Sequence, residues 1–150
     1  MLNEDYKEML QILLEERVRF IVVGAYALGA HGYPRATGDI DIWIEPTADN
    51  AKRVIRSLNR FGAPLFDVSE EEFAREGIVF QIGVAPRRID IITAIDGVEF
   101  RSAHGQKLEI SVEAMSIPVL SLEDLIKNKE STGREKDSLD AKMLKKRMIP

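Results

Sequence analysis

The stretch GDIDIWIEP, residues 38–46, decides how this chain folds. In it Asp39 and Asp41 alternate with isoleucines, and successive side chains of a β-strand point to opposite faces of the sheet. The pattern predicts a strand that buries its isoleucines on one face and presents two carboxylates on the other, with Cα atoms about 6.5 Å apart. Carboxylates are unfavourable in a strand unless something neutralises them, and two that converge can bind one hard cation.

A third carboxylate lies in RRIDIIT, residues 87–93, where Asp90 stands between two isoleucines of a second predicted strand. If the two strands adjoin, Asp90 joins Asp39 and Asp41. Three carboxylates can hold two Mg²⁺ ions, an arrangement used for in-line phosphoryl and nucleotidyl transfer. We therefore interpret all three aspartates as candidate catalytic and metal-binding residues, with Mg²⁺ as the expected ion and Mn²⁺ as the alternative. For an isolated Asp-x-Asp pair, two solvated carboxylates are the competing interpretation.

The segment before the aspartates predicts a phosphate site. Phe20–Val23 has the pattern of a short buried strand, Gly24 interrupts it, and Ala25–Ala30 has the pattern of a short helix. Glycine lets the backbone approach a ligand closely, and the first turn of a helix offers free N–H groups. We therefore expect Gly24 and Ala25 to bind phosphate. A plain turn from strand to helix is the alternative.

Two polar residues precede the aspartates in the connecting loop. Arg35 can bind phosphate through two guanidinium nitrogens, or it can pair with an acidic neighbour. Thr37 is a further nucleotide-binding candidate, with a hydrogen bond to its own backbone as the alternative.

Composition restricts the class of protein. The chain has 150 residues, of which 45% are hydrophobic and 31% charged, so we expect one compact domain over residues 1–150. It has no cysteine and two histidines, which excludes disulfides and thiol catalysis and disfavours a zinc enzyme. No apolar run approaches the roughly 20 residues of a membrane span, and the acidic start lacks the layout of a signal peptide. We expect a cytoplasmic protein without a membrane partner.

Apolar periodicity and capping residues predict an α/β alternation. The expected fold class is α/β (α+β), a mixed sheet with helices packed on one side. Helix starts are expected at Asn3, Thr47 and Ser121, and a helix end at Gly62. Val98–Arg101 is expected to form a short strand.

The order of these motifs resembles a known superfamily. Gly24, then Asp39-x-Asp41, then Asp90 on a later strand resemble the polymerase-beta-type nucleotidyltransferases. More narrowly, GYPRATGDIDIWIEP and DLIKNKESTGREKDSLDAKML resemble small bacterial AbiEii-like nucleotidyltransferase-fold proteins, over about residues 20–144. The resemblance implies a nucleotidyltransferase-like fold, a glycine that touches triphosphate and three metal-ligating aspartates. The chain departs from the superfamily at Ala25, where Gly or Ser is usual, so a serine hydroxyl for phosphate is missing.

The C-terminal region differs in charge from the rest of the chain. Residues 127–150 contain eight basic and four acidic residues, a net charge of +4 in a chain of −4. By the resemblance, the helices of about residues 121–147 pack on the core and bring Lys129 to the cleft, where it would neutralise triphosphate charge. For residues 142–147 a solvated helix face is the preferred interpretation.

Together these features predict a Mg²⁺-dependent nucleotidyltransferase. It would move an NMP group from an NTP to a hydroxyl of an RNA end, a protein or a small molecule and release pyrophosphate. The alternative is a non-catalytic interaction protein of the same fold, one half of a toxin–antitoxin or phage-defence pair, with a protein partner. Ala25 favours the alternative, and the complete aspartate set favours the enzyme. The negative net charge argues against broad nucleic-acid binding.

Overall fold

The computed structural model describes residues 2–34, 38–65, 68–84 and 86–148, and it contains one six-stranded sheet. The strands are β1 (Phe20–Val23), β2 (Ile40–Ile44), β3 (Val79–Ile82), β4 (Ile89–Ile92), β5 (Leu108–Val112) and β6 (Met115–Val119). The helices are α1 (Glu4–Glu15), α2 (Gly24–Ala30), α3 (Ala48–Phe61), α4 (Glu70–Phe73), α5 (Phe100–Gly105), α6 (Leu122–Ser131), α7 (Glu135–Lys145) and the 3₁₀ turn η1 (Lys146–Met148).

The sheet mixes parallel and antiparallel pairs, in the order β3-β4-β2-β1-β6-β5. At its centre β2 runs antiparallel to β1 and parallel to β4. The outer pairs β3–β4 and β5–β6 are antiparallel, and β1 and β6 are parallel. The predicted fold class, a mixed sheet with helices, is confirmed.

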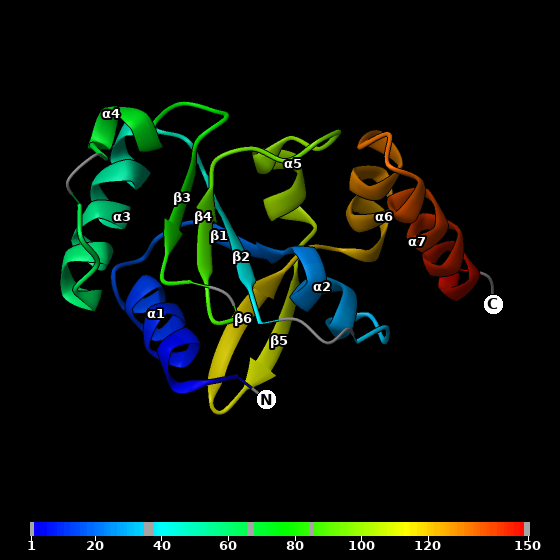
Figure 1. The fold of residues 1–150 in the computed structure, drawn as a ribbon, viewed down its shortest axis with the longest axis horizontal. Coiled ribbons are helices and arrows are strands. Elements are labelled where there is room, and N and C mark those ends of the chain that lie inside the picture. Colours follow the sequence, from blue (N-terminus) through cyan, green and yellow to red (C-terminus); the bar gives the residue numbers. More distant parts are fainter. Residues whose placement is uncertain (1, 35–37, 66–67, 85, 149–150) are drawn as a thin grey trace.

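Helices α1, α3 and α4 lie on one side of the sheet and α5, α6 and α7 on the other (Figure 1), so the helices are not all packed on one side as expected. On the first side, α1 packs against α3, and α3 packs against α4. On the second side, the Phe100 ring of α5 meets the indole of Trp43 edge-on, with centroids 5.1 Å apart. Trp43 shares the strand face of Asp41 and is 1% exposed, so its indole belongs to the core.

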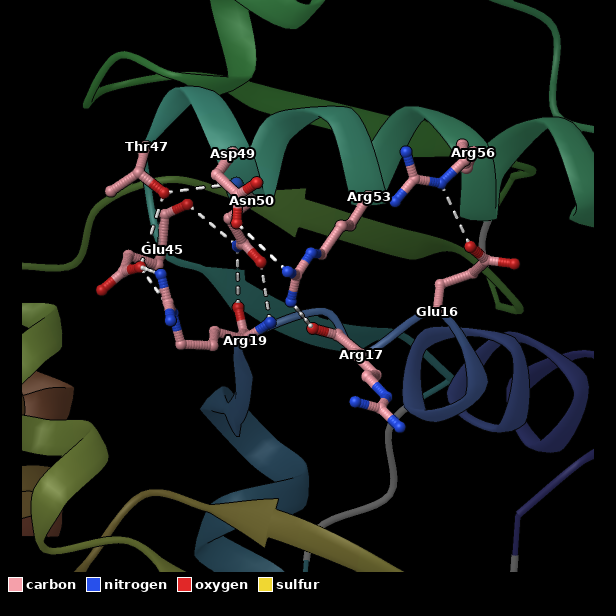
Figure 2. Close-up of polar contacts among 9 residues, drawn as sticks. All are labelled: Glu16, Arg17, Arg19, Glu45, Thr47, Asp49, Asn50, Arg53 and Arg56. Atoms are coloured by element: carbon pink, nitrogen blue, oxygen red, sulfur yellow. Dashed lines mark hydrogen bonds and ion pairs between the residues drawn. The ribbon is translucent and has the colours of Figure 1, made fainter.

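A buried asparagine fixes the register of the two central strands at the end opposite the aspartates (Figure 2). The Asn50 Oδ1 atom accepts from the backbone N–H of Arg19 at 2.8 Å. Its Nδ2 donates to the carbonyls of Arg19 and Glu45, each at 3.0 Å. A shift of one residue in the strand pairing would turn every side chain of β2 to the other face. The three hydrogen bonds of Asn50 therefore help to keep Asp41 on its face of β2.

The predicted helix ends are confirmed at the named residues. Asn3, Thr47 and Ser121 each accept a backbone N–H of their own first turn. Gly62 ends α3 in the left-handed region, with φ +90°. The side chains of Asn3, Thr47 and Ser121 satisfy N–H groups that have no partner within the helix.

The predicted strand Val98–Arg101 is wrong. After an isolated bridge between Ile95 and Val98, the chain turns into α5 at Phe100. Phe100 and Ala103 are both buried, and a spacing of three places them on one helix face. The two ring contacts of Phe100, with Trp43 and with the imidazole of His104, suit that helix.

The C-terminal helices α6 and α7 pack against each other (Figure 1) and contribute to the core. Their core residues are Leu125, Ile126, Ala141 and Leu144. Within the described ranges, none of the helices combines the length and the apolar character needed to cross a membrane.

Candidate active site

Three adjacent strands bring the predicted aspartates together beside Gly24. Asp41 of β2 is the Cα partner of Asp90 in the parallel neighbour β4 and of Val23 in the antiparallel neighbour β1. Directly paired residues project to the same face, so Asp41 and Asp90 lie side by side. Asp39, two residues before Asp41, has the same strand phase. The pairing of β2 with β4 is the one on which the predicted carboxylate cluster depends.

Gly24 lies directly against the carboxylate of Asp41. It has φ +69° and is the first residue of α2. A Cβ atom at this position would collide with the Asp41 carboxylate. No side chain caps the first turn of α2, and Ala25 follows within it. The glycine thus permits a backbone approach that other residues would block.

The carboxyl of Asp41 is the most strongly perturbed acid of the site. Burial, the charge and hydrogen bond of Asp90 and the charge of Asp39 together raise its pKa from 3.8 to about 6. Arg88 opposes this shift without cancelling it. Crowded carboxylates favour a shared proton or a cation, so this strand face has a physical reason to bind positive charge.

Arg88 occupies the centre of the cluster, and our sequence interpretation did not include it. Its Nε donates to Asp90 Oδ1 at 2.8 Å, and its Nη2 donates to Asp90 Oδ2 at 3.2 Å. Nη2 also lies 3.0 Å from Asp39 Oδ2. The hydroxyl of Tyr6 in α1 donates to the Arg88 carbonyl at 3.1 Å. The available signal was the spacing Arg88-x-Asp90, which places both side chains on one strand face.

The aspartates converge around the guanidinium of Arg88. Among the described residues, no group of three or more acidic or histidine side chains stands ready to hold a metal ion. Asp41 and Asp90 touch each other, and Asp39 and Asp90 are joined through Arg88. The oxygen atoms of these three carboxylates remain the candidate cation ligands on this face.

Of the other predicted nucleotide-binding residues, Lys129 is the one that the structure describes, and it pairs elsewhere. Arg35 and Thr37 fall outside the described residues. Lys129 in α6 pairs with two aspartates of α7, with its Nζ 3.2 Å from Asp137 Oδ1 and 3.4 Å from Asp140 Oδ2. Its side chain is 14% exposed. The ammonium group is thus held in the interface of α6 and α7.

The pKa of Asp137 shows that the interface of α6 and α7 stabilises an ionised carboxylate. Burial acts to raise its pKa, but hydrogen bonds from Thr132 and Lys129 and the nearby charges outweigh burial and hold the pKa below its ordinary value. Arg134 adds a contact of 2.8 Å from Nε to Asp137 Oδ2. The carboxylate is therefore stabilised in its ionised form.

The fold is shared with solved structures of nucleotidyltransferases. A proposed nucleotidyltransferase of Thermotoga maritima aligns with TM-score 0.62 and 19% identity over 99% of this chain and 95% of its own. The lincosamide antibiotic adenylyltransferase LnuA, with lincomycin bound, aligns with TM-score 0.59 and 17% identity over 97% of both chains. ANT(2″)-Ia in complex with adenylyl-2″-tobramycin aligns with TM-score 0.53 and 15% identity, over 96% of this chain and 97% of its own. Neither a protein-family model nor a curated protein matches the sequence.

Proposed function

We propose that this chain is a Mg²⁺-dependent nucleotidyltransferase that moves an NMP group from an NTP to a hydroxyl acceptor. The observation that carries the proposal is the pairing of Asp41 with Asp90 on adjacent strands beneath Gly24. A nucleotidyltransferase needs acidic side chains beside a backbone that phosphate can approach. The shared fold of solved adenylyltransferases supports this reading.

The residues fit a divalent cation by their chemistry. Mg²⁺ takes oxygen ligands and is often bound by one or two carboxylates together with substrate phosphates. Asp41 and Asp90 would supply such oxygens, with Asp39 beside them. The raised pKa of Asp41 reports crowding of negative charge, which a cation would relieve. When bound, the ion would polarise the phosphates and stabilise the charge that develops in transfer.

The remaining parts of the site would orient the nucleotide. Gly24 would let the triphosphate approach the first turn of α2, where Ala25 offers a backbone N–H but no hydroxyl. The acceptor hydroxyl would pass its proton to a carboxylate of the site, and its oxygen would bond to the α-phosphorus. The bond from that phosphorus to the oxygen that bridges it to the β-phosphorus would break, and pyrophosphate would leave. Lys129 stays a candidate for the outer phosphates only if it exchanges its pairs with Asp137 and Asp140 for phosphate.

For the acceptor, a small-molecule hydroxyl is the first choice. LnuA carries lincomycin and ANT(2″)-Ia carries adenylyl-2″-tobramycin, so chains with this fold adenylylate small molecules. An RNA end or a protein hydroxyl is the alternative acceptor, and the basic C-terminal helices would favour RNA over a neutral molecule.

Incubation with each labelled NTP, Mg²⁺ and separate pools of small molecules, RNA and protein tests the proposal. We expect labelled product in one pool, and release of pyrophosphate in equal amount. Asp41→Asn should abolish both signals while the protein stays folded. Absence of product and of pyrophosphate from every pool, at millimolar NTP, would refute the transferase.

A non-catalytic interaction protein of a toxin–antitoxin or phage-defence pair is the second candidate. Arg88 favours it, because this guanidinium already neutralises Asp39 and Asp90 without a metal. Such a protein would bind a protein partner and show no Mg²⁺-dependent NTP binding. Calorimetric titration with NTP, with and without Mg²⁺, distinguishes the two functions.

A further inference from the structure

We infer that Arg88 is an internal cation that closes the carboxylate site until a divalent ion and a nucleotide displace it together. This inference rests on the proposed function, because it describes how that same site is controlled. Its test measures metal affinity, which does not depend on turnover.

The contacts of Arg88 cover the atoms that a metal would need. The guanidinium takes both oxygens of Asp90, through Nε at 2.8 Å and Nη2 at 3.2 Å. It also takes Oδ2 of Asp39 at 3.0 Å. A fork that binds both oxygens of one carboxylate is a strong and geometrically specific contact. Two of the three candidate ligands are therefore held by one side chain.

The backbone around Arg88 keeps this contact in place. The Ile40 N–H, at the start of β2, donates at 3.0 Å to the carbonyl of Arg88, which directly precedes β4, so this bond extends the parallel pairing of the two strands. Tyr6 donates to the same carbonyl. The main chain is thus fixed, and any release of the carboxylates must come from rotation of the Arg88 side chain.

A divalent cation at the oxygens of Asp39 and Asp90 would be repelled by the guanidinium of Arg88. An ion bound to Asp90 would lie within a few ångströms of the guanidinium, and like charges at that separation repel. Arginine stays protonated at any physiological pH, so it cannot lose its charge to make room. Metal binding without nucleotide should therefore be weak.

Nucleotide gives the displaced side chain a new partner. The Arg88 side chain is 30% exposed, so it can turn outward without leaving a filled core. The phosphates of an NTP accept the same fork that a carboxylate accepts. Metal and nucleotide should then bind with positive coupling. Either ligand must displace the Arg88 side chain from the carboxylates, and the second ligand to bind finds it already displaced.

Titration of Mn²⁺, followed by electron paramagnetic resonance, tests this inference on the full chain. The variants are Arg88→Gln and Arg88→Lys, and Arg87→Gln is the matched control because it removes the neighbouring exposed arginine. Each is titrated alone and with α,β-methylene analogues of the four NTPs, which cannot transfer their nucleotide. We expect Arg88→Gln to bind Mn²⁺ about tenfold more tightly than wild type without nucleotide, a typical coupling effect. The analogues should tighten binding in wild type and Arg87→Gln far more than in Arg88→Gln.

The reverse results overturn the inference. Equal or weaker Mn²⁺ binding by Arg88→Gln would show that Arg88 organises the carboxylates for the metal, and absence of Mn²⁺ binding by all variants would remove the metal site. If Arg88→Gln does not fold, Arg88→Lys decides, because it keeps the charge and loses the fork. Loss of the fork leaves carboxylate oxygens open, but the remaining positive charge still repels the ion, so this variant should bind Mn²⁺ more tightly than wild type by less than about tenfold. Tighter binding without NMP transfer would refute the transferase and leave this role of Arg88 standing.

Discussion

The crowded carboxyl of Asp41 links the pH dependence of stability to this site. Its pKa of about 6 lies above the ordinary 3.8, so the folded protein holds this proton more tightly than the unfolded chain does. The group therefore favours folding below about pH 4, and its contribution falls as the pH rises from about 4 to about 6. Above that range it destabilises the fold by up to about 3 kcal/mol, since one pKa unit corresponds to about 1.36 kcal/mol.

Asp41→Asn should remove this penalty. We expect its free energy of unfolding at pH 7 to exceed that of wild type by about 1–3 kcal/mol, with the difference shrinking toward pH 4. Urea denaturation at pH values from 4 to 8 measures the effect. Asp39→Asn serves as the comparison, because it relieves part of the charge beside Asp41 but also removes a partner of Arg88, so it should stabilise the protein less than Asp41→Asn does. A clear loss of stability in Asp41→Asn at pH 7 would mean that this carboxylate supports the fold.

Gly24 gives a second test at the residue scale. Gly24→Ala forces a Cβ into the carboxylate of Asp41 and holds alanine at φ +69°. We expect a loss of about 1–3 kcal/mol in the free energy of unfolding. The matched control is Gly105→Ala in α5, where the new Cβ would meet open space.

A double variant separates the two causes of that loss. Asp41→Ala removes the collision but not the backbone strain, so Gly24→Ala should cost less in that background. Equal cost in both backgrounds would assign the whole effect to backbone strain.

The residues of the site were predictable to the extent that they follow the alternation of a strand. Asp39, Asp41 and Asp90 could be grouped because a period of two fixes their face. Arg88 has the same phase as Asp90, yet its role depends on the register between β2 and β4, which no local pattern encodes. The partners of Lys129 likewise depend on how α7 packs on α6.

At the scale of elements, the pair α6–α7 depends on a buried ion pair. Lys129 neutralises Asp137 and Asp140, whose side chains are 7% and 5% exposed. Lys129→Ala would leave two buried carboxylates with less compensation, at a cost of about 3 kcal/mol. Lys145→Ala is the control, since it breaks an exposed pair with Glu130 and should change stability by less than about 1 kcal/mol.

Urea denaturation of both lysine variants at pH 7 measures this difference. The depressed pKa of Asp137 means that its stabilisation is present above about pH 4 and is lost as the pH falls below that value. The gap between wild type and Lys129→Ala should therefore narrow in acid. Equal stability of the two lysine variants at pH 7 would mean that the pairs of Lys129 with Asp137 and Asp140 contribute little to the fold, so Lys129 could exchange them for nucleotide phosphate.

Helix starts that depend on a capping residue in the sequence were predicted correctly, whereas a short segment whose structure depends on tertiary packing was not. The caps at Asn3, Thr47 and Ser121 use a side chain and a backbone N–H three residues apart. Such signals lie within one turn of sequence. Val98–Arg101 looked like a strand because its residues are apolar in alternation, but packing of Phe100 against Trp43 selected a helix. For short segments tertiary packing overrides the local preference.

At the scale of the whole molecule, ligand linkage decides between an enzyme and an interaction protein. A ligand that binds only the folded state stabilises it by about 2.7 kcal/mol at a concentration 100 times its Kd. For a chain of this size that corresponds to a rise in Tm of about 5–10 °C. We expect this rise with one or more of the four NTPs in the presence of Mg²⁺.

The controls for this last prediction follow from the site. The same NTP without Mg²⁺, and the corresponding NMP with Mg²⁺, should raise the Tm much less, because the outer phosphates and the ion would bind together. Gly24→Val should abolish the rise, since a branched side chain would fill the space beside Asp41 that phosphate must approach. Scanning calorimetry of wild type and Gly24→Val with millimolar nucleotide provides the measurement. No rise with any NTP and Mg²⁺ would rule out the transferase, and the search for a function would move to a protein partner, starting from the basic C-terminal helices.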